Sequence, residues 1–116
     1  YDMLYDRINH CVEAGIERKR ICVDPGVGFG KSVKHNVELI SSLSIFQGLG
    51  CGLAIGVSRK SFIDSVSETE GSDRRLVGSL TALIAALNQG VNILRVHDVS
   101  ETLQALNTWH KIVMER

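Results

Sequence analysis

The hydrophobic and polar positions along this chain follow two alternating patterns, which predict four helices and three strands. Apolar residues three or four apart predict helices over 2–14, 36–47 and 73–89, and over a last segment capped by Ser100. Short apolar runs predict strands over 21–23, 53–57 and 92–96. The polar stretch 64–73 is expected to be an exposed loop. The resulting order is a regular alternation of helices and strands.

The predicted strands are almost continuously apolar, which is typical of strands buried on both faces in a parallel sheet covered by helices. Three parallel strands alone would leave two unpaired edges and a half-covered face. We therefore expect the chain either to oligomerise or to form part of a larger barrel or doubly wound sheet. In both architectures ligands bind at the carboxyl ends of the strands, so the residues directly after each strand are the candidates for function.

Length and composition narrow the class of protein. The 116 residues are too few for a whole α/β barrel, and 44% of them are hydrophobic and 22% charged, as in a globular domain. The 13 basic and 13 acidic residues are interspersed, which disfavours a nucleic-acid partner, and no apolar run reaches the roughly 20 residues of a membrane span. Three cysteines without metal-binding spacing suggest reduced thiols in the cytoplasm. The start at Tyr1, inside a predicted helix and without a secretory signal, suggests that an upstream segment is missing.

A glycine-rich loop, 24–31, follows the first predicted strand. It is not a dinucleotide fingerprint, because Gly30 comes one place too early, and it is not a P-loop, because Pro25 stands where the first glycine is required. Asp24, at the end of the strand, is either a turn-forming residue or a carboxylate that accepts two hydrogen bonds from an N–H pair on a heterocycle. Both interpretations stay open from the residues alone.

The second predicted strand is followed by Ser58, Arg59, Lys60 and Ser61. Two adjacent cations flanked by hydroxyls are costly next to an apolar strand unless they meet solvent or an anion. The segment is therefore either a solvated loop or a binding site for an anionic group.

Arg95 and His97 lie at the end of the third predicted strand. The alternation of side chains along a strand places both on one side, where together they would suit a phosphate or pyrophosphate. The alternative is an ion pair between Arg95 and Asp98 beside a packed histidine.

These three segments, 23–31, 56–61 and 94–99, resemble the dihydropteroate synthases of the pterin-binding family in order and in spacing. The resemblance covers essentially all 116 residues. It implies a (β/α)₈ TIM barrel of which this chain forms the C-terminal three βα units. Residues 1–116 would then be a partial pterin-binding domain without its N-terminal strands.

The resemblance also implies an activity. The family is a transferase of folate biosynthesis that condenses 6-hydroxymethyl-7,8-dihydropterin pyrophosphate with p-aminobenzoate, giving 7,8-dihydropteroate and pyrophosphate. It further implies a cytoplasmic sulfonamide target that is a homodimer when complete. Mg²⁺ is the implied cofactor, with its ligand in the missing N-terminal part and no metal ligand in this chain.

By the family's pattern, two of the three segments would hold the organic substrates. Asp24 would bind the N–H edge of the pterin, and Lys60 its ring carbonyl and nitrogen. Phe29 would line the site near the aminobenzoate, which Ser58 and Arg59 would border. The amine nucleophile is neutral at pH 7, so no residue is assigned as a catalytic acid or base.

The third segment would supply Arg95 and His97 to hold the pyrophosphate. Positive charge there suits a leaving group on which negative charge develops. The family's other pterin and metal ligands have no counterpart in this sequence, so we expect the chain to hold half a site and to be inactive alone. Two alternatives remain: a related pterin-binding methyltetrahydrofolate methyltransferase, and a non-catalytic split or truncated product.

The role implied for Lys60 gives a first prediction. In a complete protein, Lys60→Ala should lower turnover on the order of 10²-fold or more, as removal of a key electrostatic donor can. Steady-state kinetics would measure it, and near-normal turnover would contradict the assignment.

Overall fold

The computed structural model describes residues 1–28, 31–56, 62–68 and 75–115, which form an α/β arrangement around a parallel sheet. The strands are β1 (Cys22–Val23), β2 (Gly52–Ile55) and β3 (Ile93–Leu94), in the order β1-β2-β3. The α-helices are α1 (Asp2–Glu13), α2 (Val33–Ser41), α3 (Phe62–Ser67), α4 (Leu76–Leu87) and α5 (Val99–Met114), and 3₁₀ turns η1 and η2 cover Arg18–Arg20 and Leu43–Leu49. Cys22 pairs with Gly52, and Ala54 pairs with Ile93. The prediction of parallel strands separated by helices is therefore confirmed.

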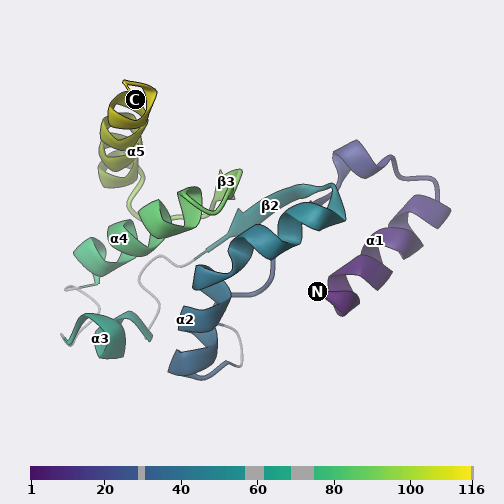
Figure 1. Ribbon diagram of the computed structural model, residues 1–116, viewed down its shortest axis with the longest axis horizontal. Coiled ribbons are helices and arrows are strands. Elements are labelled where there is room, and N and C mark those ends of the chain that lie inside the picture. The colour runs from purple at the N-terminus through teal and green to yellow at the C-terminus, as the bar shows by residue number, and fades with distance from the viewer. Residues whose placement is uncertain (29–30, 57–61, 69–74, 116) are drawn as a thin grey trace.

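The described residues form a flat, open arc. The extents are 45 × 37 × 22 Å, and the radius of gyration is 15.2 Å, against about 13 Å for a compact domain of this length. In Figure 1, α1 and α5 lie at opposite ends, with the sheet, α2 and α4 between them. Ile93 in the outer strand β3 is 50% exposed, so the expectation that every strand is buried on both faces is wrong there.

The core is built around the central strand β2. Leu53 and Ile55 are 2% and 0% exposed, because their side chains share one face of the strand and helical residues cover it. Helical residues of η2 and α4 pack with them, including Leu43, Leu83 and Ala86. Burial of these side chains from water is the main stabilising term available to the chain.

The second predicted helix is in fact two elements. α2 begins after Ser32, whose Oγ accepts a hydrogen bond from the His35 N–H at 3.1 Å, and it ends at Ser41. The chain then tightens into η2, in which Leu43, Phe46 and Leu49 are all buried. Their spacing of three residues matches the period of a 3₁₀ helix, so one face of η2 meets the core.

The predicted exposed loop over 64–73 is wrong in its first part, because α3 covers Phe62–Ser67; residues 69–74 lie outside the described chain. Phe62 and Ile63 are 7% and 3% exposed and anchor this helix in the core. Asp64 also forms a bidentate ion pair with Arg75, with Nε–Oδ1 and Nη2–Oδ2 distances of 2.8 and 2.7 Å. Asp64, a polar residue of this stretch, thus belongs to a partly buried ion pair that joins α3 to the start of α4.

The last helix starts two residues earlier than expected from a cap at Ser100. α5 begins at Val99 with Asp98 in the N-cap position, so the prediction that Ser100 caps it is wrong. Among the described helices, none combines the length and the apolar character needed to cross a membrane.

Close packing between α3 and α4 yields a prediction. In Gly78→Ala the new Cβ would overlap Ile63 Cγ2, which belongs to a buried, β-branched side chain with little freedom to move. Overpacking costs about 1–3 kcal/mol, which outweighs the roughly 1 kcal/mol that alanine gains over glycine in a helix. Urea unfolding of the complete protein should show a net loss of about 1 kcal/mol.

The neighbouring substitution Val77→Ala is the matched control, because Val77 is 74% exposed on the same helix. It should leave the free energy of unfolding nearly unchanged. Equal stability of the Gly78→Ala and Val77→Ala variants would contradict the packing argument.

Candidate functional site

An ion pair joins the carboxyl ends of the two outer strands. Asp24 comes directly after β1, and Arg95 comes directly after β3, with Arg95 Nη2 at 2.7 Å from Asp24 Oδ2. The ends of β1 and β3 are separated by about 10 Å, twice the spacing of neighbouring strands. A long arginine side chain spans that separation across the end of β2, so two of the sequence-predicted site residues meet in space.

Gly56 lies beneath this ion pair and makes room for it. It follows β2 directly, and a Cβ built on it would lie 2.8 Å from Arg95 Nη2 and 3.2 Å from Arg95 Nε. The Arg95 N–H also donates to the Ile55 carbonyl at 2.9 Å, which fixes the point from which the side chain leaves. The lack of a side chain at Gly56 therefore lets the guanidinium cross to Asp24. This role of Gly56 was not predicted, although a glycine directly after a central strand is a visible signal in the sequence.

The glycine-rich loop is held by hydrogen bonds on both sides. Asp24 Oδ1 accepts from the Gly26 N–H at 2.8 Å, and Lys31 Nζ donates to the Gly26 carbonyl at 2.8 Å. Asn36 Oδ1 accepts from the Gly28 N–H at 2.7 Å, and Asn36 Nδ2 donates to the Lys31 carbonyl at 3.5 Å. Gly26 and Gly28 have φ angles of 78° and 86°, which only glycine adopts readily. Residues 24–28 of the loop thus have a defined course around the Asp24 carboxylate.

Asn36 and Lys31 are functional candidates that sequence reasoning missed. Asn36 is 1% exposed on α2. Buried polar side chains require hydrogen-bond partners, and here the partners are backbone groups of the loop. The available signal was one polar residue on the face of α2 that turns toward the core.

The other predicted site residues stand as follows. His97 is exposed two residues beyond Arg95, and its convergence with Arg95 on one ligand stays a prediction. Within the described residues the ion pair of Arg95 is with Asp24 and not with Asp98, so the alternative pairing is not the one observed. The remaining candidates, Phe29, Ser58, Arg59 and Lys60, lie outside the described residues.

Cys22, at the start of β1, is a poor nucleophile in this setting. Partial desolvation, followed by the negative charge of Asp24, raises the pKa of the Cys22 thiol. The thiol is therefore protonated at neutral pH, whereas nucleophilic cysteines have lowered pKa values. The three cysteines are free thiols.

The described residues contain no group of three or more histidine, cysteine, aspartate or glutamate side chains that could hold a metal ion. At the strand ends, Asp24 Oδ1 and Oδ2 already accept from Gly26 and Arg95. A metal ion would also face the positive charge of Arg95 there. This part of the chain does not fit a metal centre, and no chemical step is assigned to one.

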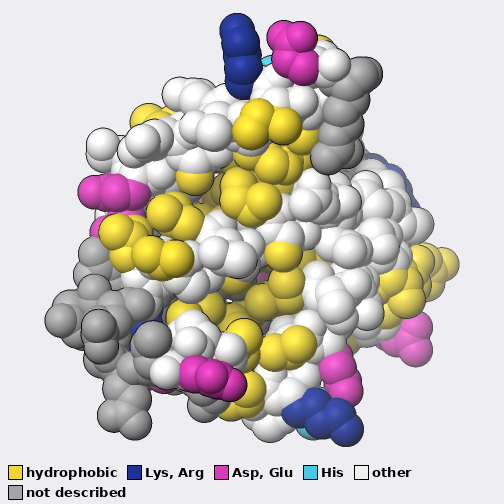
Figure 2. Space-filling model, turned by 60° about the vertical axis from the view of Figure 1, so that its left-hand side comes forward, with side chains coloured by type: hydrophobic (Ala, Val, Ile, Leu, Met, Phe, Trp, Pro, Cys, Tyr) yellow, Lys and Arg dark blue, Asp and Glu magenta, His cyan; other side chains and the backbone are white. Residues whose placement is uncertain are grey.

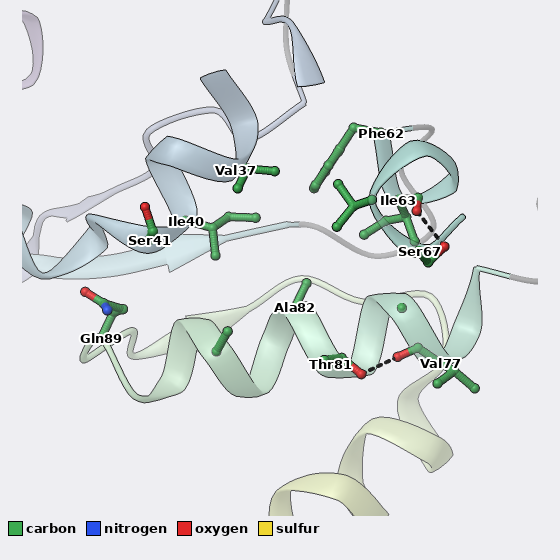
Figure 3. Close-up of a pocket in the computed structure, with 13 residues that line it drawn as sticks. Val37, Ile40, Ser41, Phe62, Ile63, Ser67, Val77, Thr81, Ala82 and Gln89 are labelled. Carbon is green, nitrogen blue, oxygen red and sulfur yellow. Dashed lines mark hydrogen bonds between the residues drawn. The ribbon is translucent and has the colours of Figure 1, made fainter. Parts of the chain in front are cut away.

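An apolar cavity of about 820 Å³ lies between α2, α3 and α4, away from the strand ends. Figure 2 shows apolar side chains gathered around a hollow on the side where α3 and α4 lie, and Figure 3 shows Val37, Ile40, Phe62 and Ile63 facing one another. The hydroxyls of Ser67 and Thr81 donate to carbonyls of their own helices, at 2.7 and 2.9 Å. The cavity therefore offers few polar groups to a ligand, and the strand ends remain the candidate site.

Comparison with known proteins bears on both fold and site. A family model described as "Pterin binding enzyme" matches residues 2–97. The dihydropteroate synthase of Haemophilus influenzae is 42% identical over 106 residues, which are 91% of this chain and 38% of that protein. The dihydropteroate synthase of Escherichia coli K12 is 42% identical over 101 residues, 87% of this chain and 36% of that protein. The chain thus spans less than two fifths of the curated relatives it matches.

Solved structures give the same picture. Dihydropteroate synthase from Xanthomonas albilineans, determined with 4-aminobenzoic acid, matches with a TM-score of 0.92 and 39% identity, over 96% of this chain and 41% of that one. Its complex with 7,8-dihydropteroate also has a TM-score of 0.92 and 39% identity, over 96% and 42% of the two chains. These neighbours are TIM barrels, so the predicted fold class, the C-terminal three βα units of a TIM barrel, is confirmed.

The close approach at Gly56 gives a prediction for the site. In Gly56→Ala the new methyl group would collide with the Arg95 guanidinium, which is the mobile end of a side chain 59% exposed. The guanidinium should move away from Asp24, while stability changes by less than about 1 kcal/mol, as for other exposed ion pairs. A crystal structure of the variant and urea unfolding of the complete protein would measure the two effects.

Gly52→Ala, at the start of β2 and four residues before Gly56, is the matched control. Its Cβ would lie 3.5 Å from Cys22 Sγ, an ordinary contact that does not involve Arg95. An Asp24–Arg95 distance that stays the same in both variants would refute the role given to Gly56.

Proposed function

This chain belongs to the pterin-binding enzyme family, and from that premise we propose that the complete protein is a dihydropteroate synthase. It would transfer the pterin of 6-hydroxymethyl-7,8-dihydropterin pyrophosphate to p-aminobenzoate, forming 7,8-dihydropteroate and releasing pyrophosphate. The observation that carries the proposal is 42% identity to curated dihydropteroate synthases over 91% of the chain. The convergence of Asp24 and Arg95 at the strand ends supports it, because both belong to the segments that carry the resemblance.

The surroundings of Asp24 suit binding of the pterin N–H edge. A carboxylate has about four acceptor positions, and one hydrogen bond to each oxygen leaves room for an N–H pair. The Asp24 side chain is 31% exposed, so a ligand can reach it. The negative charge of Asp24 also favours a ligand edge with two N–H donors over an edge with a carbonyl oxygen.

Arg95 suits the pyrophosphate group. Its guanidinium has five N–H donors, and one hydrogen bond goes to Asp24. The side chain is 59% exposed and can turn other donors toward an anion. Positive charge at that place stabilises the leaving group as negative charge develops on it. In the proposal His97 assists Arg95 there.

The remaining roles are those that the resemblance implies. Lys60 would bind the pterin ring carbonyl and nitrogen, and Phe29, Ser58 and Arg59 would border the aminobenzoate. The aminobenzoate amine is neutral at pH 7 and attacks the pterin methylene carbon as pyrophosphate leaves. No general base is assigned.

Mg²⁺ is part of the proposal for the complete protein only. When bound, it would neutralise charge on the pyrophosphate. Because the described residues do not form a metal centre, we place its ligand in the N-terminal part of the barrel. We also propose a cytoplasmic homodimer that sulfonamides inhibit. Exposed Val37 and Val66 around the apolar cavity supply surface of the kind that dimers bury.

An assay with defined substrates tests the proposal. The complete protein, given the pterin pyrophosphate and p-aminobenzoate, should form dihydropteroate and one pyrophosphate per product, and none when p-aminobenzoate is omitted. Asp24→Asn, which keeps the shape but removes the charge, should lower the rate on the order of 10²-fold. Residues 1–116 alone should be inactive, because they hold half of the expected site.

Three outcomes would count against it. Methyl transfer from methyltetrahydrofolate without pyrophosphate release would favour the related methyltransferases. Failure of the complete protein to act on either set of substrates would favour a non-catalytic product. Activity of residues 1–116 near that of the complete protein would disprove the proposal that these residues hold half of the site.

A further inference from the structure

We propose that Lys31 and Asn36 are positioning residues that hold the Asp24 carboxylate in the orientation that binds the pterin. This inference rests on the proposed function and extends it to residues that contact no substrate. The observation behind it is a continuous hydrogen-bond path from buried Asn36 in α2, through Lys31 and Gly26, to Asp24.

The path starts from a rigid point. Asn36 is 1% exposed and lies in the first turn of α2, where its N–H donates to the Ser32 carbonyl at 3.0 Å. Its side-chain oxygen accepts from Gly28 and its side-chain nitrogen donates to Lys31, so both ends of the amide are engaged. A buried amide is costly without such partners, so the loop and the helix must form together.

Lys31 links Asn36 to the part of the loop around Gly26. Its carbonyl is held by Asn36, and its ammonium reaches back to the Gly26 carbonyl at 2.8 Å. Gly26 in turn donates its N–H to Asp24 Oδ1 at 2.8 Å. The charged donor on one side of Gly26 therefore fixes the direction of the N–H that Gly26 presents to Asp24.

The Asp24 carboxylate is then held at both oxygens by different elements. Oδ1 is tied to the loop through Gly26, and Oδ2 is tied to β3 through Arg95. Loss of the Lys31 contact would loosen the first tie and leave the second in place. The carboxylate could then rotate away from the plane that an N–H pair requires, which would weaken pterin binding.

A purely structural role for Lys31 predicts that its removal lowers the melting temperature, whereas a positioning role does not. The loop is also anchored by Val27, which is 1% exposed in the core. Removal of the Lys31 ammonium should therefore leave the loop folded while it changes the orientation of Asp24. The effect should appear in the affinity for the pterin, with little change in the melting temperature.

The test compares Lys31→Met, Lys31→Arg and Lys34→Met in the complete protein. Lys31→Met keeps the alkyl chain and removes the donor, so the KM for the pterin pyrophosphate should rise about 10-fold, the effect of one hydrogen bond from a charged group. The kcat and the KM for p-aminobenzoate should change less than about 2-fold. Lys31→Arg should restore most of the loss, because it keeps a charged donor of similar reach.

Lys34→Met is the matched control. It removes the same group three residues later, where the Lys34 side chain is 83% exposed and 3.9 Å from Glu38. Its kinetics should equal those of the wild type. A crystal structure of Lys31→Met should show Asp24 Oδ1 no longer bonded to the Gly26 N–H.

The inference and the proposed function fail in different ways. Wild-type protein that makes no dihydropteroate would overturn the proposed function. Active wild type with an unchanged pterin KM in Lys31→Met would overturn the positioning role. A parallel loss of kcat, of both KM values and of melting temperature in Lys31→Met would also overturn it, in favour of a structural role.

Discussion

The ion pair between Asp24 and Arg95 is the contact on which the geometry of the strand ends depends. It spans the end of β2, and it is possible because Gly56 offers no side chain where the guanidinium crosses. Both partners are partly exposed, so the pair contributes little to the free energy of folding, typically under about 1 kcal/mol. Its effect is on position, because it sets a carboxylate and a guanidinium side by side where the ends of parallel strands meet.

Stability comes from a different part of the molecule. The buried residues of β2, η2 and α4 form the apolar core, whereas Asp24 and Arg95 are partly exposed. That difference in burial leaves the polar groups around Asp24 free to be arranged for binding rather than for packing. The loop after β1 joins the two parts, since Val27 is in the core while Gly26 and Gly28 present N–H groups to Asp24 and Asn36.

The sequence predicted the parallel α/β order and the importance of the strand ends, because hydrophobic period and strand topology are local and general properties. It could not predict that Arg95 pairs with Asp24, because that choice depends on the register of three strands and on the space above Gly56. The division of 36–47 into α2 and η2 followed a three-residue spacing that a helical stripe also satisfies. Asn36 was overlooked because only the fold shows that a helical asparagine is buried against a loop.

The cavity and the strand ends could each bind a ligand, and the polar groups available at each place distinguish them. The cavity between α2, α3 and α4 is large, yet the hydroxyls of Ser67 and Thr81 along it bond to carbonyls of their own helices. At the strand ends, by contrast, a carboxylate, a guanidinium and the Gly26 N–H converge from the segments that follow β1 and β3. A polar heterocycle with a charged leaving group loses its hydration on binding, and the strand ends offer charged groups that can replace those hydrogen bonds. The convergence of unlike polar groups at the strand ends, rather than the size of the apolar cavity, therefore marks the candidate site.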